Sequence, residues 1–196
     1  CQASKQTSHS SLAVCSRVFR LRNKMAIILG IDPGSRITGY GLVNSVGNKL
    51  EYIHCGCVKT SSASLPERLK TIFSEICLVI EEYSPQQAAV EDVFMGKNAA
   101  SALKLGQARG SAMVACLSHD LPVAEYSARK VKQAVVGSGS ADKLQVQHMV
   151  KALLAISDNI AEDAADALAV AICHANTEAS LIRMAGAKSF SRKRFR

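Results

Sequence analysis

A buried strand that ends in a carboxylate is the feature that most constrains this chain. Residues 26–31 (AIILGI) form an almost unbroken apolar run, which is typical of a strand covered on both faces. The run stops at Asp32, directly before the turn signal Pro33-Gly34-Ser35. A carboxylate in such a place is costly unless it is paired or binds a metal ion. The plain alternative is that Asp32 only accepts hydrogen bonds from turn amides, and the local pattern leaves both interpretations open.

The remainder of the chain alternates between strand-like and helix-like segments. Residues 37–43 and 49–59 are β-rich and joined by short polar turns, which predicts an antiparallel meander with the first strand. Helical periodicity or composition then predicts helices over 65–83, 99–119, 128–136, 142–156 and 163–176, with short strands over 87–92 and 122–126. This order predicts an α/β fold, a mixed five-stranded sheet flanked by helices, in a single domain.

Acidic residues recur where predicted elements begin or end. Glu91-Asp92 close the strand over 87–92 just as Asp32 closes the first strand, and the ends of parallel neighbouring strands lie close together. Asp163 and Asp166 are three residues apart in an alanine-rich helix, so they share one helix face. The alternative for Asp163 is that an acid in a first helical turn merely complements the helix dipole.

Taken together, the four carboxylates of Asp32, Glu91, Asp163 and Asp166 indicate a site for divalent cations. Mg²⁺ suits this arrangement because it binds few carboxylates and completes its shell with water and phosphate oxygens. Two such ions at one site activate a water and stabilise the leaving oxygen in a phosphodiester displacement. The sequence shows no Ser-His-Asp arrangement, Walker loop or zinc-type cysteine spacing that would indicate a rival chemistry.

The charge is concentrated at the two ends of the chain. Of the formal net charge of +8, residues 1–24 carry +5, residues 183–196 carry +6, and the residues between them carry −3. Basic ends on a near-neutral body suit a polyanionic partner, although they are equally typical of solubilising, disordered tails.

Three parts of the chain follow from these patterns. Residues 1–24 are Ser-rich and acid-free and precede Met25, so we expect a non-native or disordered extension, with a transit peptide as the alternative. Residues 25–181 form the expected folded domain, and residues 182–196 an expected basic, disordered tail. Cysteines scattered through helix-like segments indicate a reducing compartment, and no apolar run is long enough for a membrane span. We therefore expect a cytoplasmic protein.

Four motifs in the same order resemble the RuvC family of bacterial Holliday-junction resolvases, the crossover junction endodeoxyribonucleases. They are GIDPGSRITGYG at 30–41, EDVFMGKNAASALKLGQARG at 91–110, YSARKVKQAVVGSGSADKLQVQHMV at 126–150 and EDAADALAVAICH at 162–174. The resemblance extends over about residues 25–176. It implies a ribonuclease-H-like fold, a homodimer with two active sites, and paired Mg²⁺-dependent nicks in opposing strands of four-way junction DNA.

The resemblance also implies roles for individual residues. The four acids named above match the family's catalytic, metal-binding carboxylates, which would hold two Mg²⁺ ions, with Mn²⁺ as a possible substitute. The residues that match or flank the family's DNA-binding positions are Phe94, Lys97, Lys130, Lys132 and Lys143. Phe94 beside Lys97 would be an apolar wedge next to a cation, as used to unstack bases, unless the aromatic ring packs into the core. For Lys130 a solvated helix face is an equally good explanation. The family further implies a branch-migration helicase complex as partner.

Three other functions compete with this interpretation. A phosphate-binding turn similar to GIDPG occurs in actin-like ATPases, but this chain is too short for their second phosphate loop and subdomain. A ribonuclease-H-fold nuclease acting on RNA·DNA hybrids would share the acids but not the loop that carries Phe94. A catalytically inactive junction-binding module would not need all four acids. Cleavage assays on junctions and hybrids, and an Asp32→Asn variant that keeps junction binding, separate these possibilities.

Overall fold

The computed structural model describes residues 25–60, 64–93 and 98–191, with side chains up to residue 185. A five-stranded mixed sheet lies at its centre, in the strand order β3-β2-β1-β4-β5. Strands β1 (Met25–Asp32), β2 (Ile37–Val46) and β3 (Lys49–Lys59) form the predicted antiparallel meander. Strands β4 (Gln87–Glu91) and β5 (Val123–Tyr126) continue the sheet, parallel to β1. The expected mixed five-stranded sheet is confirmed.

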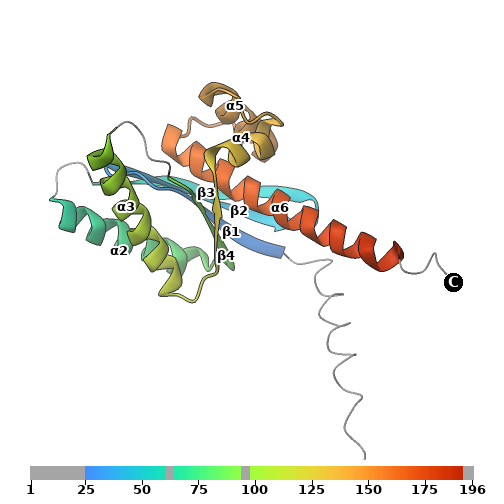
Figure 1. Ribbon diagram of the computed structural model, residues 1–196, viewed down its shortest axis with the longest axis horizontal. Coiled ribbons are helices and arrows are strands. Elements are labelled where there is room, and N and C mark those ends of the chain that lie inside the picture. Colours follow the sequence, from blue (N-terminus) through green and yellow to red (C-terminus); the bar gives the residue numbers. More distant parts are fainter. Residues whose placement is uncertain (1–24, 61–63, 94–97, 192–196) are drawn as a thin grey trace, which may run out of the picture.

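Helices cover both faces of this sheet (Figure 1). Helices α2 (Leu65–Tyr83) and α3 (Ala99–Leu117) pack on one face. Helices α4 (Ala128–Val136), α5 (Lys143–Leu154) and α6 (Glu162–Ser191) lie on the other, with α6 crossing the sheet. This three-layer arrangement explains why β1 is apolar at almost every position: Ile28 packs toward α6, whereas Leu29 and Ile31 pack toward α2 and α3.

Polar side chains at the helix starts fix where each helix begins. Asn98 accepts hydrogen bonds from the backbone N–H groups of Ala100 and Ser101, and the Ser127 hydroxyl accepts one from Lys130. Asp142 forms a reciprocal capping box with Gln145 at the start of α5. These caps explain why α3, α4 and α5 begin within a residue of the predicted starts.

Glycines allow α6 to lie directly on the sheet. A Cβ atom added at Gly39 would collide with the backbone carbonyl of Asp163, and one at Gly30 would collide with the backbone at Ala167 and Ala171. At Gly41 the obstacle would be Leu168. The absence of side chains on β1 and β2 at these positions therefore sets how close the first turns of α6 come to the sheet.

Helix α6 is much longer than predicted. The sequence pattern predicts its end at residue 176, but the helix continues to Ser191. It therefore includes residues 182–191, which the sequence analysis placed in a separate basic tail. Among the side chains that the structure describes, Ala175 is the last buried one of α6, and the helix then extends past the sheet (Figure 1). The apolar pattern ends where burial ends, and not where the helix ends. The strands over 87–92 and 122–126 and the helix over 99–119 are each shorter by one or two residues at one end, and the helix over 142–156 is shorter at both ends.

Candidate active site

Two of the predicted acids lie side by side at the carboxyl ends of adjacent parallel strands. Ile31 of β1 is in register with Val90 of β4, so Asp32 and Glu91 follow at the same edge of the sheet. Glu91 is half-buried and is the last residue of β4. The strand period places both side chains on the face that α6 covers.

The first turns of α6 bring the other two acids to the same edge. Gly39 of β2 is opposite Asp32 in the sheet and lies against the backbone of Asp163. Asp166 follows one turn later, with 19% of its side chain exposed. The close approach at Gly39 thus places Asp163 and Asp166 over the end of β1.

The pKa shifts show that these carboxylates act on one another. Burial, followed by repulsion from Glu91, Asp166 and Asp163, raises the pKa of Asp32 from 3.8 to about 8. Burial and repulsion from Asp166 also raise the pKa of Glu91. Burial raises the pKa of Asp166, although its ion pair with Lys143 opposes the shift. The four predicted acids therefore form one electrostatic unit that a cation would stabilise.

Two of the predicted basic residues lie at the same site. A pocket of about 130 Å³ is lined by Glu91 and Asp166 together with Lys132 of α4 and Lys143 of α5, and by small apolar side chains between them. The ammonium group of Lys143 is 3.0 Å from the Asp166 carboxylate and also pairs with Glu162. Burial opposes the charge of Lys143, but these hydrogen bonds outweigh it and raise its pKa.

The remaining predicted DNA-binding residues are not in this pocket. Lys130 is exposed, and its ammonium group lies 4.6 Å from the centre of the Tyr126 ring. Phe94 and Lys97 lie outside the described residues.

The donor set suits a hard cation, although no complete cage is formed. Among the residues that the structure describes, no three His, Cys, Asp or Glu side chains are gathered closely enough to hold an ion by themselves. Mg²⁺ does not require such a cage, because it keeps several water and phosphate ligands. The mutual repulsion of half-buried carboxylates and their hard oxygen atoms fit Mg²⁺ or Mn²⁺ better than softer metals.

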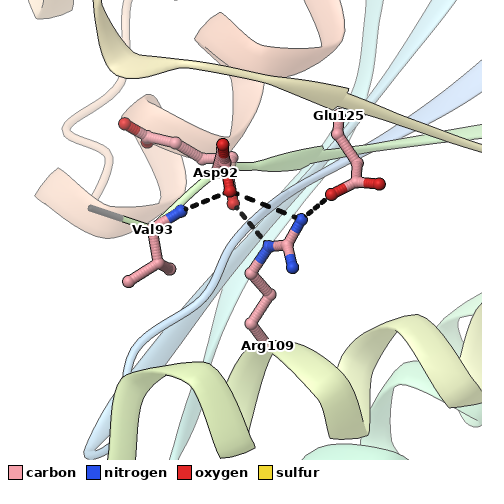
Figure 2. A network of polar contacts seen from close by, with 5 residues as sticks. Asp92, Val93, Arg109 and Glu125 are labelled. Carbon is pink, nitrogen blue, oxygen red and sulfur yellow. Dashed lines mark hydrogen bonds and ion pairs between the residues drawn. The ribbon is translucent and has the colours of Figure 1, made fainter. Parts of the chain in front are cut away.

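Sequence reasoning missed an arginine that ties α3 to the edge of the site. Arg109 donates from Nε to the backbone carbonyl of Glu91 (3.2 Å), and its Nη2 pairs with Glu125 and lies 3.7 Å from Asp92. Figure 2 shows the guanidinium reaching from the helix toward Asp92 and Glu125 at the strand ends. Its partners come from two separate strands, so no spacing in the sequence reveals it. Glu162 was also missed, because an acid in a first helical turn usually serves the dipole.

A larger depression lies at the other end of the sheet. It has a volume of about 600 Å³ and is lined by the β2–β3 turn, by Leu153 of α5 and by α6 from Ile172 to Arg183. None of its lining residues is a predicted site residue. Chemistry and electrostatics, and not size, therefore identify the smaller pocket as the candidate site.

Comparisons with known proteins agree with this geometry. The family model described as "Crossover junction endodeoxyribonuclease RuvC" matches residues 28–174. The chain belongs to the RuvC family. It is 61% identical over 171 residues to the crossover junction endodeoxyribonuclease RuvC of Saccharophagus degradans, covering 87% of this chain and 99% of that protein.

Solved structures extend the RuvC comparison to the fold. RuvC of T. thermophilus in complex with a Holliday junction substrate superposes with a TM-score of 0.75 at 34% identity, over 80% of this chain and 97% of that one. The yeast mitochondrial Holliday junction resolvase Ydc2 gives a TM-score of 0.61 at 10% identity, over 91% of this chain and 89% of that one, and supports the fold alone. The expected ribonuclease-H-like fold of a RuvC resolvase is confirmed. RuvC proteins are metal-dependent nucleases.

Proposed function

We propose that this chain is a Holliday-junction resolvase, a metal-dependent endonuclease that makes paired, symmetric nicks in opposing strands of four-way DNA junctions during homologous recombination and repair. The observation that carries the proposal is the cluster of four carboxylates at one edge of the sheet, where burial and repulsion from the other three acids raise the pKa of Asp32. Two lysines beside this cluster provide positive charge for a phosphate group.

Asp32, Glu91, Asp163 and Asp166 are the proposed catalytic carboxylates and would hold two Mg²⁺ ions, or Mn²⁺ in their place. When bound, the two ions activate a water and stabilise the leaving oxygen of the scissile phosphodiester. The protein's own contribution is to hold four oxygen donors on rigid elements, two at strand ends and two in the first turns of a helix. Burial keeps bulk water from screening these charges.

The basic residues would position the DNA. Lys143 and Lys132 line the pocket on the side opposite the β-strands, where they can contact phosphates flanking the cut. Lys130, exposed on the same helix as Lys132, serves as an outer phosphate contact. Phe94 and Lys97 are proposed as the wedge and its adjacent cation. We expect Phe94→Ala to lower cleavage more than junction binding, and an equal loss of both would contradict the wedge role.

A homodimer is proposed because symmetric nicks in two strands need two sites, and α3 offers a surface for a second copy. Leu103, Val114 and Leu117 are exposed apolar residues on one face of α3. Gly106 and Gly110 lie on the same face with open space above them, which would let a second helix approach closely. We expect Leu103→Lys to produce monomers in analytical ultracentrifugation. The matched control, Leu144→Lys at an exposed position of α5, should remain dimeric.

The wider setting follows from the family. We propose that the protein acts with a branch-migration helicase complex in the cytoplasm. Among the described residues, no helix is long and apolar enough to cross a bilayer. Residues 25–181 are the proposed nuclease domain, with residues 1–24 as an extension outside it and 182–196 contributing positive charge.

The deciding experiment is cleavage of a synthetic four-way junction with Mg²⁺, with nick positions mapped on all four strands. A linear duplex and an RNA·DNA hybrid serve as parallel substrates. We expect symmetric nicks in two opposing strands, with the junction alone, and no cleavage by Asp32→Asn although it still binds the junction. Cleavage of the hybrid alone would instead identify a ribonuclease. Tight junction binding by the unmodified protein without any cleavage would identify an inactive binding module.

A further inference from the structure

The peptide group that joins Glu91 to Asp92 is held at both of its polar atoms. Its N–H, on Asp92, donates to the carbonyl of Tyr126 at the end of β5 (2.8 Å). Its carbonyl, on Glu91, accepts the hydrogen bond from Nε of Arg109 (3.2 Å). One bond comes from the neighbouring strand and the other from α3 on the far face of the sheet. A shift of the backbone at Glu91, from which its side chain projects, would strain or break both bonds.

Carboxylates hold the guanidinium in the required orientation. Arg109 is only 17% exposed, and its Nη2 pairs with Glu125 of β5 and Asp92 (Figure 2). Glu125 is in register with Val90, the residue before Glu91. The guanidinium therefore joins the ends of β4 and β5 to α3. Joining these three elements requires a planar group that donates in two directions from separate nitrogen atoms, which arginine provides and lysine does not.

We propose that Arg109 is a positioning residue for Glu91, which it holds in place through the backbone carbonyl of Glu91 and not through charge. The inference rests on the proposed role of Glu91 in the active site. The guanidinium thus has two functions: its Nε hydrogen bond places the Glu91 carboxylate, whereas its Nη2 ion pairs neutralise Asp92 and Glu125.

Arg109→Lys tests the inference because it keeps the charge but loses the forked geometry. Three quantities are measured: Mn²⁺ affinity without DNA by calorimetry, the single-turnover cleavage rate at saturating Mg²⁺, and the junction dissociation constant. We expect losses of about tenfold or more in metal affinity and cleavage, as for other residues that orient metal ligands, with junction binding and melting temperature nearly unchanged. If Arg109→Lys does not fold, Arg109→Gln, which keeps a shorter neutral donor, is expected to show the same loss of metal affinity.

Asp92→Asn and Glu125→Gln are the matched controls. Each removes the charge of one partner of Arg109 but keeps a side-chain oxygen that can accept from Nη2, so the guanidinium stays oriented toward the Glu91 carbonyl. Both variants should therefore keep metal affinity and cleavage close to those of the unmodified protein. Losses in these controls equal to that of Arg109→Lys would overturn the proposal, because charge pairing would then explain the effect. Unchanged metal affinity and cleavage in Arg109→Lys, or a parallel fall in melting temperature and every activity, would overturn it as well. If the unmodified protein does not cut the junction, the proposed function fails, and the Mn²⁺ affinity of Arg109→Lys alone decides the positioning role.

Discussion

At the scale of single residues, the site is a set of carboxylates held in unfavourable surroundings. Asp32 is half-buried and faces three other acids, and its pKa is raised to about 8 for that reason. Lys143 supplies a positive charge, but it contacts Asp166 and Glu162 and not Asp32. The metal-free protein therefore retains a proton on Asp32 at neutral pH, and metal binding must release it.

This predicts a pH-dependent gain in stability for Asp32→Asn. The folded protein keeps a proton on Asp32 between pH 3.8 and about 8 that the unfolded chain releases, so stability falls as the pH rises through this window. Asparagine at position 32 does not ionise, so the folded variant has no cost of a buried charge that grows with pH. Without metal, we expect Asp32→Asn to melt above the unmodified protein at pH 8, by about 2–4 °C for each kcal/mol of relieved repulsion. The gap should close toward pH 4, and parallel melting curves across pH would contradict the assignment.

A second prediction concerns Lys143, whose ammonium group lies among the carboxylates of the site. The Lys143 ammonium group pairs with Asp166, where it would compete with a metal ion, and it also pairs with Glu162, which competes with Asp166 for it. We expect Lys143→Met to bind Mn²⁺ severalfold more tightly without DNA, and Glu162→Gln to bind it more weakly. Calorimetric titration of both variants measures the change. Shifts of the same sign in both variants would refute this competition.

At the scale of elements, α6 and the β1–β2 pair form the framework of the site. At Gly30, Gly39 and Gly41 the strands place no side chain beneath the helix. Because the packed backbone leaves no space, the distance from Asp163 to the end of β1 is set by the glycines and not by the acids.

Gly39→Ala should therefore damage the site through the backbone. The added methyl group collides with the carbonyl of Asp163, so α6 must shift, at a cost of about 1–3 kcal/mol in the free energy of unfolding. We expect Mn²⁺ affinity to fall together with stability. The control is Gly47→Ala on the β2–β3 turn, where the positive φ of 63° makes the substitution costly for stability but no atom lies near the added Cβ, so metal affinity should stay unchanged. Unaltered metal affinity in Gly39→Ala would show that the close approach does not set the site.

How far the sequence predicts these features depends on whether a feature is local. Strand β1, its terminal Asp32 and the pair Asp163 and Asp166 follow from local pattern, since burial leaves its period in the sequence. The pairing of Lys143 with Glu162 depends on how α5 and α6 meet, which no local pattern records. The same holds for Arg109, whose partners come from β4 and β5, and for the glycines under α6. The second half of α6 escaped prediction because its residues 176–185 are half-buried or exposed and leave no periodic apolar pattern.

At the scale of the whole molecule, the excess positive charge lies away from the acidic site. The described body carries the acidic site, whereas the basic residues are concentrated toward the two ends of the chain. Helix α6 joins these properties, since it begins at the acids and continues beyond the sheet toward the basic C-terminal end (Figure 1). We therefore expect phosphate contacts made by the basic ends of the chain to be separable from the cleavage step.

Truncation after Ser191 tests this separation. It removes four basic residues, Arg192, Lys193, Arg194 and Arg196. If all four contact phosphates, the slope of log affinity against log salt should become shallower by up to about 3–4, because each neutralised phosphate contributes about 0.9. The single-turnover cleavage rate at saturating protein should not change. An unchanged salt slope would mean that these residues do not contact the DNA.

The direct contact between α6 and the glycines also governs how such a gene can diverge. The carboxylates of α6 are correctly placed only while β1 and β2 present no side chain beneath them. Residues 30–41 and 162–174 are far apart in the chain, yet a side chain added at Gly30, Gly39 or Gly41 requires a compensating change in α6. We therefore expect the two stretches to change together during evolution. A recombinant gene that takes residues 30–41 from a relative with side chains at these glycine positions would need the matching start of α6 as well.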